Sequence, residues 1–272
     1  ANVTYTVVGG PFDGKSYSLP LFTGTRPNTN FGAITQIANI VPSHYNALVL
    51  KFDRRMTTGL QVQAFYTYSQ AWDQGQTSNT GTPTQNVLNP YDLALEGARS
   101  NFDIRHRFVT LAVWQPTVYN GADRVERLLL NGFSISPIIS VSSGAPVTGR
   151  ISGSVPFGLG STSSGINGSG TGAGRAFWIP RNDFQLPRTA QVDMEIAKGF
   201  QFTERWRFQM FVQAFNLFNH TNATGADTLL YTVSGTAAAP QLKYNTDFLH
   251  VTASSNTLIA QRQIQIGAKL SW

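Results

Sequence analysis

The sequence has no cysteine, few charged side chains and no run of about twenty apolar residues. The absence of cysteine excludes disulfide bonds and thiolate chemistry, and the absence of a long apolar run excludes a membrane-spanning helix. Charged residues make up 12% of the 272 residues, whereas a soluble domain usually has about 25%. Hydrophobic residues still make up 41%. The chain therefore combines a large apolar surface with a polar surface built mainly from uncharged side chains.

The formal net charge of +6 does not by itself indicate a nucleic-acid partner. The 20 lysine and arginine residues are scattered along the chain and form no basic cluster of the kind that binds phosphate backbones. We therefore expect no nucleic-acid binding.

The clearest pattern lies at residues 262–272. Apolar side chains occupy every second position from Ile264 to Trp272, with glutamine, glycine, lysine and serine between them. A period of two over about ten residues is typical of a strand that crosses a bilayer in a barrel, with one face toward lipid and one toward a polar lumen. Trp272 is then expected in an interfacial aromatic girdle. The alternative is the edge strand of a soluble sheet.

The same alternation recurs along the chain and predicts about eight strands. They are expected at residues 2–8, 45–53, 60–72, 104–114, 129–141, 189–198, 206–214 and 262–272, with additional short strands near 229–233 and 241–250. Pro137 weakens its strand or marks a bulge in it.

The lengths of the connections alternate along the chain. Long connections begin near Gly9, Asp73, Ser142 and Asn219, and shorter ones cover residues 54–59, 115–127 and 199–203. Outer-membrane barrels have short periplasmic turns and long extracellular loops. The expected fold is therefore all-β, an antiparallel up-and-down transmembrane-type β-barrel that forms a single domain over residues 1–272. It either closes by itself or belongs to a larger barrel.

The strand pattern also assigns side chains to the two faces of the sheet. Four charged residues, Asp193, Glu195, Arg205 and Arg207, are expected toward the lumen, where ion pairing is favoured over a catalytic carboxylate pair. The residues expected to face lipid or a protein interface are Leu48, Leu50, Phe52, Val62, Val192, Met194, Phe208, Met210, Ile264, Ile266 and Trp272.

No catalytic, cofactor or metal site is expected. The four histidines, at positions 44, 106, 220 and 250, do not share the spacing of metal ligands. Residues 170–174 resemble a phosphate-binding loop, but no helix is predicted after them, so a low-complexity loop is favoured. The sequence therefore predicts a protein that is not an enzyme.

Several motifs carry a family resemblance. They are YNALVLK at 45–51, YTYS at 66–69, NPYD at 89–92, SNFDIRHRF at 100–108, AFNLFNHT at 214–221 and RQIQIGAKL at 262–270. In this order they resemble the C-terminal barrel region of TonB-dependent receptors, in particular the Oar-like receptors of Acidobacteria.

The resemblance implies a barrel of about twenty-two strands in the bacterial outer membrane, of which this chain would form roughly the last third. The plug, the segment that engages TonB and a signal peptide are not expected within these residues. The implied partners are outer-membrane lipid, the barrel-assembly machinery that reads the strand ending at Trp272, and the remainder of the barrel. The implied function is ligand binding by extracellular loops and uptake.

A second hypothesis is a structural role. A piece of barrel exposes unpaired strand edges, which can pair with further copies of the same chain. Copies would then assemble into a ring, a tube or an extracellular filament at the cell surface.

Overall fold

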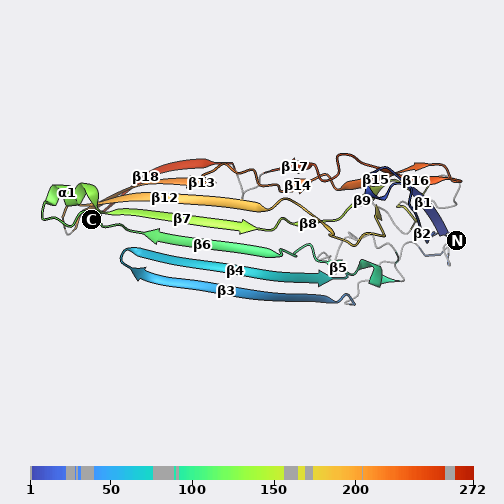
Figure 1. Cartoon of the computed structure of the whole chain (residues 1–272), viewed down its shortest axis with the longest axis horizontal. Coiled ribbons are helices and arrows are strands. Elements are labelled where there is room, and N and C mark those ends of the chain that lie inside the picture. The colour runs from blue at the N-terminus through green and yellow to red at the C-terminus, as the bar shows by residue number, and fades with distance from the viewer. Residues whose placement is uncertain are drawn as a thin grey trace.

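The computed structural model describes residues 2–22, 28, 30–31, 40–75, 89, 92–155, 165–168, 174–203, 205–254 and 261–272. It is an elongated molecule with a large sheet at one end and a smaller sheet at the other (Figure 1). The C-terminus lies at the outer end of the large sheet, and the N-terminus lies beside the small one. Among the described residues, no helix combines the length and the apolar character that a membrane span requires.

The large sheet contains eight strands in the described part of the chain, and every pairing in it is antiparallel. Its path runs β18-β13-β12-β7-β6-β4-β3, so each long strand lies beside its neighbour in the order of the chain, and the short β5 pairs with β4. The sheet curls as half of a barrel. The predicted all-β, up-and-down, outer-membrane type of fold is confirmed. The bounds are β3 (Ser43–Thr57), β4 (Leu60–Asp73), β5 (Ala98–Arg99), β6 (His106–Trp114), β7 (Phe133–Ser142), β12 (Thr189–Gln201), β13 (Arg207–Phe215) and β18 (Gln263–Ser271).

The hairpin between β3 and β4 is tighter than the sequence indicated. Its turn contains only Thr58 and Gly59, whose φ angles of 50° and 76° are those of a type I′ turn. A β-carbon on Gly59 would lie 2.3 Å from the carbonyl oxygen of Gln115. The segment 54–57, predicted as part of the turn, continues β3 through a register shift.

The connection between β6 and β7 contains the helix α1 (Arg124–Leu130). Asp123 caps its first turn, because its Oδ1 accepts hydrogen bonds from the backbone N–H groups of Val125 (2.8 Å) and Glu126 (3.0 Å). The prediction that a strand starts at residue 129 was therefore wrong, and β7 begins only at Phe133. Pro137 causes no bulge. The pairing of β7 with β12 runs through Pro137 without a break. The pairing of β7 with β6 is interrupted at Pro137, because proline has no N–H to donate.

The small sheet is assembled from three distant parts of the chain. Its order is β10-β9-β15-β16-β1-β2, and β1 pairs with β16 and β9 with β15 in parallel. The short strands predicted near 229–233 and 241–250 are β15 and β16. The prediction that residues 2–8 form a barrel strand was wrong, because they belong to this sheet. The bounds are β1 (Asn2–Val8), β2 (Ser16–Pro20), β9 (Arg150–Ser152), β10 (Gly174–Arg175), β15 (Leu229–Gly235) and β16 (Pro240–Tyr244).

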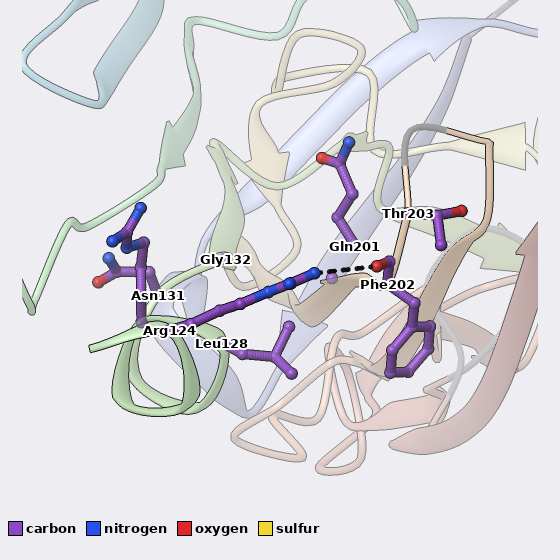
Figure 2. A pocket seen from close by; sticks show the side chains of 9 residues that line it. Arg124, Leu128, Asn131, Gly132, Gln201, Phe202 and Thr203 are labelled. Carbon is purple, nitrogen blue, oxygen red and sulfur yellow. Dashed lines mark hydrogen bonds between the residues drawn. The ribbon is translucent and has the colours of Figure 1, made fainter. Parts of the chain in front are cut away.

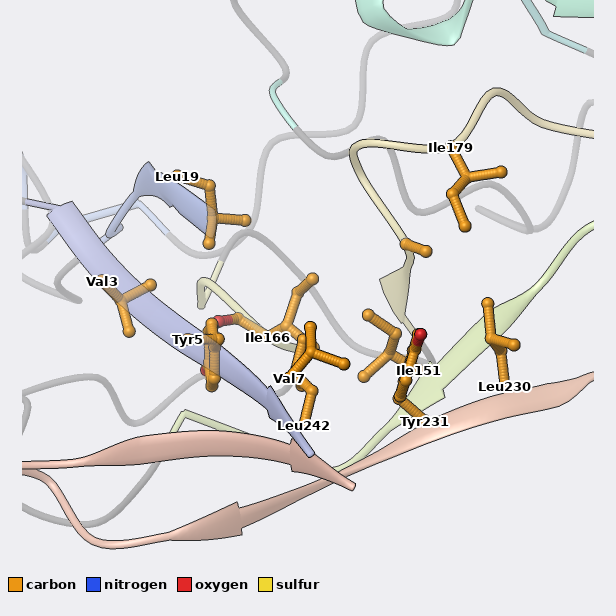
Figure 3. Packing of buried hydrophobic residues seen from close by; sticks show 11 residues of the cluster. Val3, Tyr5, Val7, Leu19, Ile151, Ile166, Ile179, Leu230, Tyr231 and Leu242 are labelled. Atoms are coloured by element: carbon orange, nitrogen blue, oxygen red, sulfur yellow. The ribbon is translucent and has the colours of Figure 1, made fainter. Parts of the chain in front are cut away.

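The apolar core of the described residues lies in the small sheet rather than in the large one (Figure 3). Val3, Tyr5 and Val7 of β1 are almost fully buried and pack with Tyr231 and Leu242. The remaining short elements connect the two sheets or cap their ends: η1 (Gly10–Phe12), η2 (Leu93–Glu96), β8 (Pro146–Val147) with β11 (Phe184–Gln185), and β14 (Gly225–Ala226) with β17 (Val251–Ala253).

Candidate membrane-spanning surface and its charged anchor

The strand register collects apolar side chains on one face of the large sheet. Residues directly opposite each other in an antiparallel pair point to the same side, so the pairings define rows across the strands. One row contains Ile266, Val212, Ile196, Ile135, Trp114 and Leu60. Every member of this row is a large apolar residue, although the row crosses six strands. We call the side to which it points the apolar face.

The strand residues predicted to face lipid or an interface all point to the apolar face. Large side chains on it remain open: Ile266 is 74% exposed, Ile264 64% and Leu50 54%. The described protein therefore does not cover this face, and contact with lipid stays a prediction. The strand residues of the predicted set that lie here are Leu48, Leu50, Phe52, Val62, Val192, Met194, Phe208, Met210, Ile264 and Ile266.

Aromatic side chains mark both margins of the apolar face. Trp272 follows β18, is 82% exposed and lies 6.1 Å from the ring of Trp206. Tyr66 and His106 lie near the opposite margin, where Tyr66 Oη and His106 Nδ1 are 2.8 Å apart. Trp114 lies eight residues after His106 on β6, a distance of about 27 Å along a strand. This separation matches the apolar band of about 25 Å in outer-membrane barrels.

The opposite face of the large sheet carries most of its polar side chains. Asp193 accepts hydrogen bonds from Gln191 Nε2 (2.9 Å) and from the backbone N–H of Asn216 (2.8 Å). Glu195 accepts one from Gln213 Nε2 at 2.6 Å. Both carboxylates therefore bind neutral donors at the polar face.

The predicted ion pairs between these carboxylates and two arginines were wrong. Within the described residues, Arg207 lies opposite Gln201 at the other end of the hairpin, because the register places Gln213 beside Glu195. Arg205 lies in the turn before β13 rather than on its polar face. The alternation of the sequence predicted the face of Arg207 correctly, but not its position along the strand.

No metal site is formed by the described residues: they contain no group of three or more histidine or acidic side chains that could hold an ion. His106 instead contacts Tyr66, and His44 stacks on Trp72 with ring centroids 5.5 Å apart. Residues 170–173 of the glycine-rich segment lie outside the described residues, as do Pro90 and Tyr91 of the NPYD motif.

A buried carboxylate organises the chain just before β6. The side chain of Asp103 has no exposed surface and accepts hydrogen bonds from Arg99 Nε (2.8 Å), Arg105 Nη2 (3.0 Å) and the backbone N–H of Ala71 (2.8 Å). Burial raises the pKa of Asp103, but these three donors outweigh burial and hold the pKa below its ordinary value. The strand predicted from residue 104 begins only at His106, directly after these contacts.

A second buried charge cluster joins the two sheets. Arg181 Nη2 lies 2.5 Å from Asp73 Oδ1 at the end of β4, and its Nε donates to the carbonyl of Glu96 at 2.9 Å. Arg175 Nη2 pairs with Glu96 Oε1 at 3.1 Å. We call these residues and Asp103 with its arginines the charged anchor. The sequence did not predict the anchor, because Arg175 and Arg181 come from a connection far from β4 in the chain.

The small sheet carries an aromatic cluster. Tyr17 and Trp178 are stacked with ring centroids 4.1 Å apart, and Phe12 meets Trp178 edge-on at 6.1 Å. Beneath them, Tyr5 Oη donates to the carbonyl of Ile166 at 2.6 Å. Burial raises the pKa of Tyr231 to about 12. The described parts of the long connections thus contribute to a packed body at one end of the large sheet.

Comparisons with known proteins agree with this geometry at the level of the family. A family model described as "Outer membrane beta barrel domain" matches residues 20–265. No curated protein and no solved structure matches the chain.

Proposed function

Because this chain belongs to the outer membrane beta barrel domain family, we propose that it forms part of the wall of a TonB-dependent receptor barrel. The observation that carries the proposal is the uncovered apolar face, which is continuous over all the long strands and bounded by aromatic residues. The connections between long strands that contribute to the small sheet all leave the large sheet at the same end (Figure 1). A barrel wall with extracellular loops requires this arrangement.

The two edges of the large sheet support membership of a larger barrel. Among the described residues, β3 and β18 each pair with a single long strand, so each presents one edge of unpaired N–H and C=O groups. Unpaired backbone groups within the hydrocarbon region of a membrane are too costly to persist. We propose that further strands of the same barrel pair with both edges. The resemblance to TonB-dependent receptors supplies the type of barrel.

The small sheet would carry the receptor function. Its buried core and the charged anchor fix the position of its aromatic cluster relative to the wall, so a ligand would meet a preformed surface. In this proposal the chain binds and helps to transport its ligand without catalysing a reaction and without a cofactor.

The proposal is tested in the bacterium that produces the protein. We expect deletion of its gene, and separately of the gene for TonB, to abolish growth on the same member of a panel of iron and carbon sources. Restoring the gene should restore growth only where TonB is present. If restoring the gene corrects the growth defect equally well in a strain without TonB, the proposal is refuted.

The unpaired edges of β3 and β18 also favour a second function, assembly of many copies through strand pairing into a ring, tube or extracellular filament. The mass of the purified particle distinguishes the two. Large particles that stay soluble without detergent would support assembly, and a particle that requires detergent would support the receptor.

A further inference from the structure

A basic cavity lies on the polar face, at the end of the large sheet that carries the short connections. It has a volume of about 930 Å³, which is within the range of small-molecule sites, about 300–1,000 Å³. None of its described lining residues is acidic. The polar-face residues that line it include Gln201, Arg207, Gln209, Lys269 and Ser271.

The strand register places the two cations of this cavity close together. Arg207 pairs with Ser271, and Gln209 pairs with Lys269, on the neighbouring strands β13 and β18. Arg207 and Lys269 are therefore diagonal neighbours on one face, about 7–8 Å apart. Both side chains are exposed, and within the described chain neither belongs to an ion pair. Because two like charges at this separation repel each other, an anion between them would stabilise both.

A second basic cavity, of about 630 Å³, adjoins the first (Figure 2). The two cavities share Gly199 and Gln201 among their lining residues. Arg124 and Arg127 of α1 line the second cavity, and Arg124 Nη2 donates to the carbonyl of the residue after Gln201 at 3.4 Å. Arg207 lies opposite Gln201 in the register. Positive charge from α1 and from the sheet therefore gathers around Gln201.

The acidic side chains of the described residues do not neutralise these cations. On the polar face, Glu195 lies four strand positions from the row that contains Lys269, about 13 Å along the strand and farther than the screening length of about 8 Å at physiological ionic strength. Asp123 accepts hydrogen bonds from the first turn of α1, and neither it nor Glu126 lines either cavity. Glu204 lies outside the described residues.

The charged anchor at the other end of the sheet shows a different arrangement. There, each arginine pairs with a carboxylate of the same chain. The cations of the two cavities have no such partner within the described chain, although they are just as close to one another in sequence and register. A cleft lined by charge of one sign attracts and concentrates molecules of the opposite sign. This difference favours a negatively charged partner from outside the chain.

We propose that the two adjoining cavities bind a small soluble molecule that carries two or more acidic groups, either phosphates or carboxylates. One acidic group lies between Arg207 and Lys269, where Gln209 donates a further hydrogen bond. A second acidic group contacts Arg124. The N–H groups of a guanidinium form a planar fork that matches the paired oxygens of a phosphate or a carboxylate.

The proposal rests on the proposed function in one respect, since the polar face must line a lumen that water and solutes enter. The end with the short connections faces the periplasm in outer-membrane barrels. The site lies at the opposite end of the large sheet from the small sheet and its aromatic cluster. It would therefore hold an anion near the periplasmic exit of the lumen, rather than at the extracellular surface.

Isothermal titration calorimetry of the full-length protein in neutral detergent tests the site with two probes, pyrophosphate and citrate. We expect binding, and the tighter probe identifies phosphate or carboxylate as the preferred group. The double variant Arg207→Gln/Lys269→Gln should bind about a hundredfold more weakly, the change that corresponds to loss of one charge-assisted hydrogen bond at each position. The matched control is Lys51→Gln/Arg107→Gln, which removes two exposed cations from the same face toward its other margin. It should bind like the unchanged protein.

The variant Lys269→Glu gives an independent measurement. Its carboxylate would be the diagonal neighbour of Arg207 and would occupy the site from within the chain, so binding should be abolished. Three results would overturn the proposal: no binding of either probe to the unchanged protein, unchanged binding to Lys269→Glu, or an equal loss in the Lys51→Gln/Arg107→Gln control. The last result would show that only the overall charge of the face attracts the probes.

Failure of this proposal is distinguishable from failure of the proposed function, because the titration requires no transport. The growth assay tests uptake, and membrane fractionation tests the location of the apolar face. Specific binding by a protein that fails the growth assay would refute the receptor and support the anion site. Growth that depends on TonB, together with one of the three results above, would support the receptor and refute the anion site.

Discussion

The sharpest stability prediction concerns Asp103, because one substitution removes its charge and leaves its shape unchanged. In Asp103→Asn, the amide oxygen can still accept the hydrogen bond from Ala71, but Arg99 and Arg105 both lose their carboxylate partner. The chain between β5 and β6 is closed by backbone hydrogen bonds from Ser100 to Ala71 (2.9 Å) and from Ser69 to Arg105 (3.0 Å). Opening of this segment is therefore the expected consequence.

The structure sets the size of the effect. Breaking a buried ion pair by removing one partner costs about 3–5 kcal/mol. Asp103 is fully buried, but the side chains of Arg99 and Arg105 are 27% and 30% exposed, so solvent compensates part of the loss. We expect the lower end of the range, about 3 kcal/mol, which is roughly a hundredfold increase in the population of the open form.

Amide hydrogen exchange measures this opening directly. The amides of Ser69 and Ser100 should exchange roughly a hundredfold faster in Asp103→Asn. The matched control is Asp53→Asn, which removes an exposed pair with Lys51 (3.3 Å) and should leave these amides unchanged. Unchanged protection of Ser69 and Ser100 in Asp103→Asn would show that the carboxylate does not hold the segment.

The pH dependence gives a second measurement of the same prediction. The pKa of Asp103 is lowered in the folded protein, so its stabilising contribution is present above its ordinary pKa of about 4 and is lost as the pH falls through the lower, folded-state value. Protection of Ser69 and Ser100 should therefore decrease at acidic pH in the unchanged protein. In Asp103→Asn the same decrease should be absent.

Three further predictions test the faces and the core. Ile266→Lys should block membrane insertion, since a lysine in the middle of the apolar face of a membrane barrel costs about 2–4 kcal/mol. Gln265→Lys on the polar face should insert normally in the same assay. Gly267→Val should impair folding, because a β-carbon there would lie 2.3 Å from the ring of Phe211. Adding Phe211→Ala to the same chain removes this ring and should restore a folded protein that resists unfolding on heating. The pKa of Tyr231 is raised to about 12, so the contribution of Tyr231 to the stability of the small sheet is fully present below pH of about 10 and is lost as the pH rises through 12. The phenolate absorbance that Tyr231→Phe removes should titrate near 12.

The alternation of apolar and polar residues predicted the fold class and the faces of the large sheet well. Side chains alternate strictly between the two sides of a strand. The face of each residue can therefore be assigned from its own strand, before the neighbouring strands are known. Residues as distant as Leu50 and Ile266 were thereby assigned to one face, and the register places them there.

Alternation does not contain the information that fixes register, so contacts across strands were predicted poorly. The pairing of Glu195 with Gln213 depends on how many residues the turn between β12 and β13 occupies. The Glu195 carboxylate therefore accepts a hydrogen bond from the neutral amide of Gln213, and Arg207, the expected partner, lies near the turn. The charged anchor was missed for a related reason: Arg175 and Arg181 approach Asp73 and Glu96 through tertiary folding of a glycine-rich connection that has no periodic signal.

The error at residues 2–8 shows what separates the two sheets. Val3, Tyr5 and Val7 alternate in the same way as Ile264 and Ile266, yet the first three are at most 2% exposed and the last two are 64% and 74% exposed. The period of two reports that one side of a strand avoids water, and it does not identify what covers that side. For β1 the cover includes Ile166, Ala176 and Ile179 from the connection before β12, which pack against the buried side of the small sheet. For the large sheet no described part of the chain provides a cover, although its apolar face crosses every long strand and ends at aromatic residues on both margins. An uncovered apolar surface of this extent is stable only against another apolar phase, and this requirement is what supports the proposal that lipid covers it.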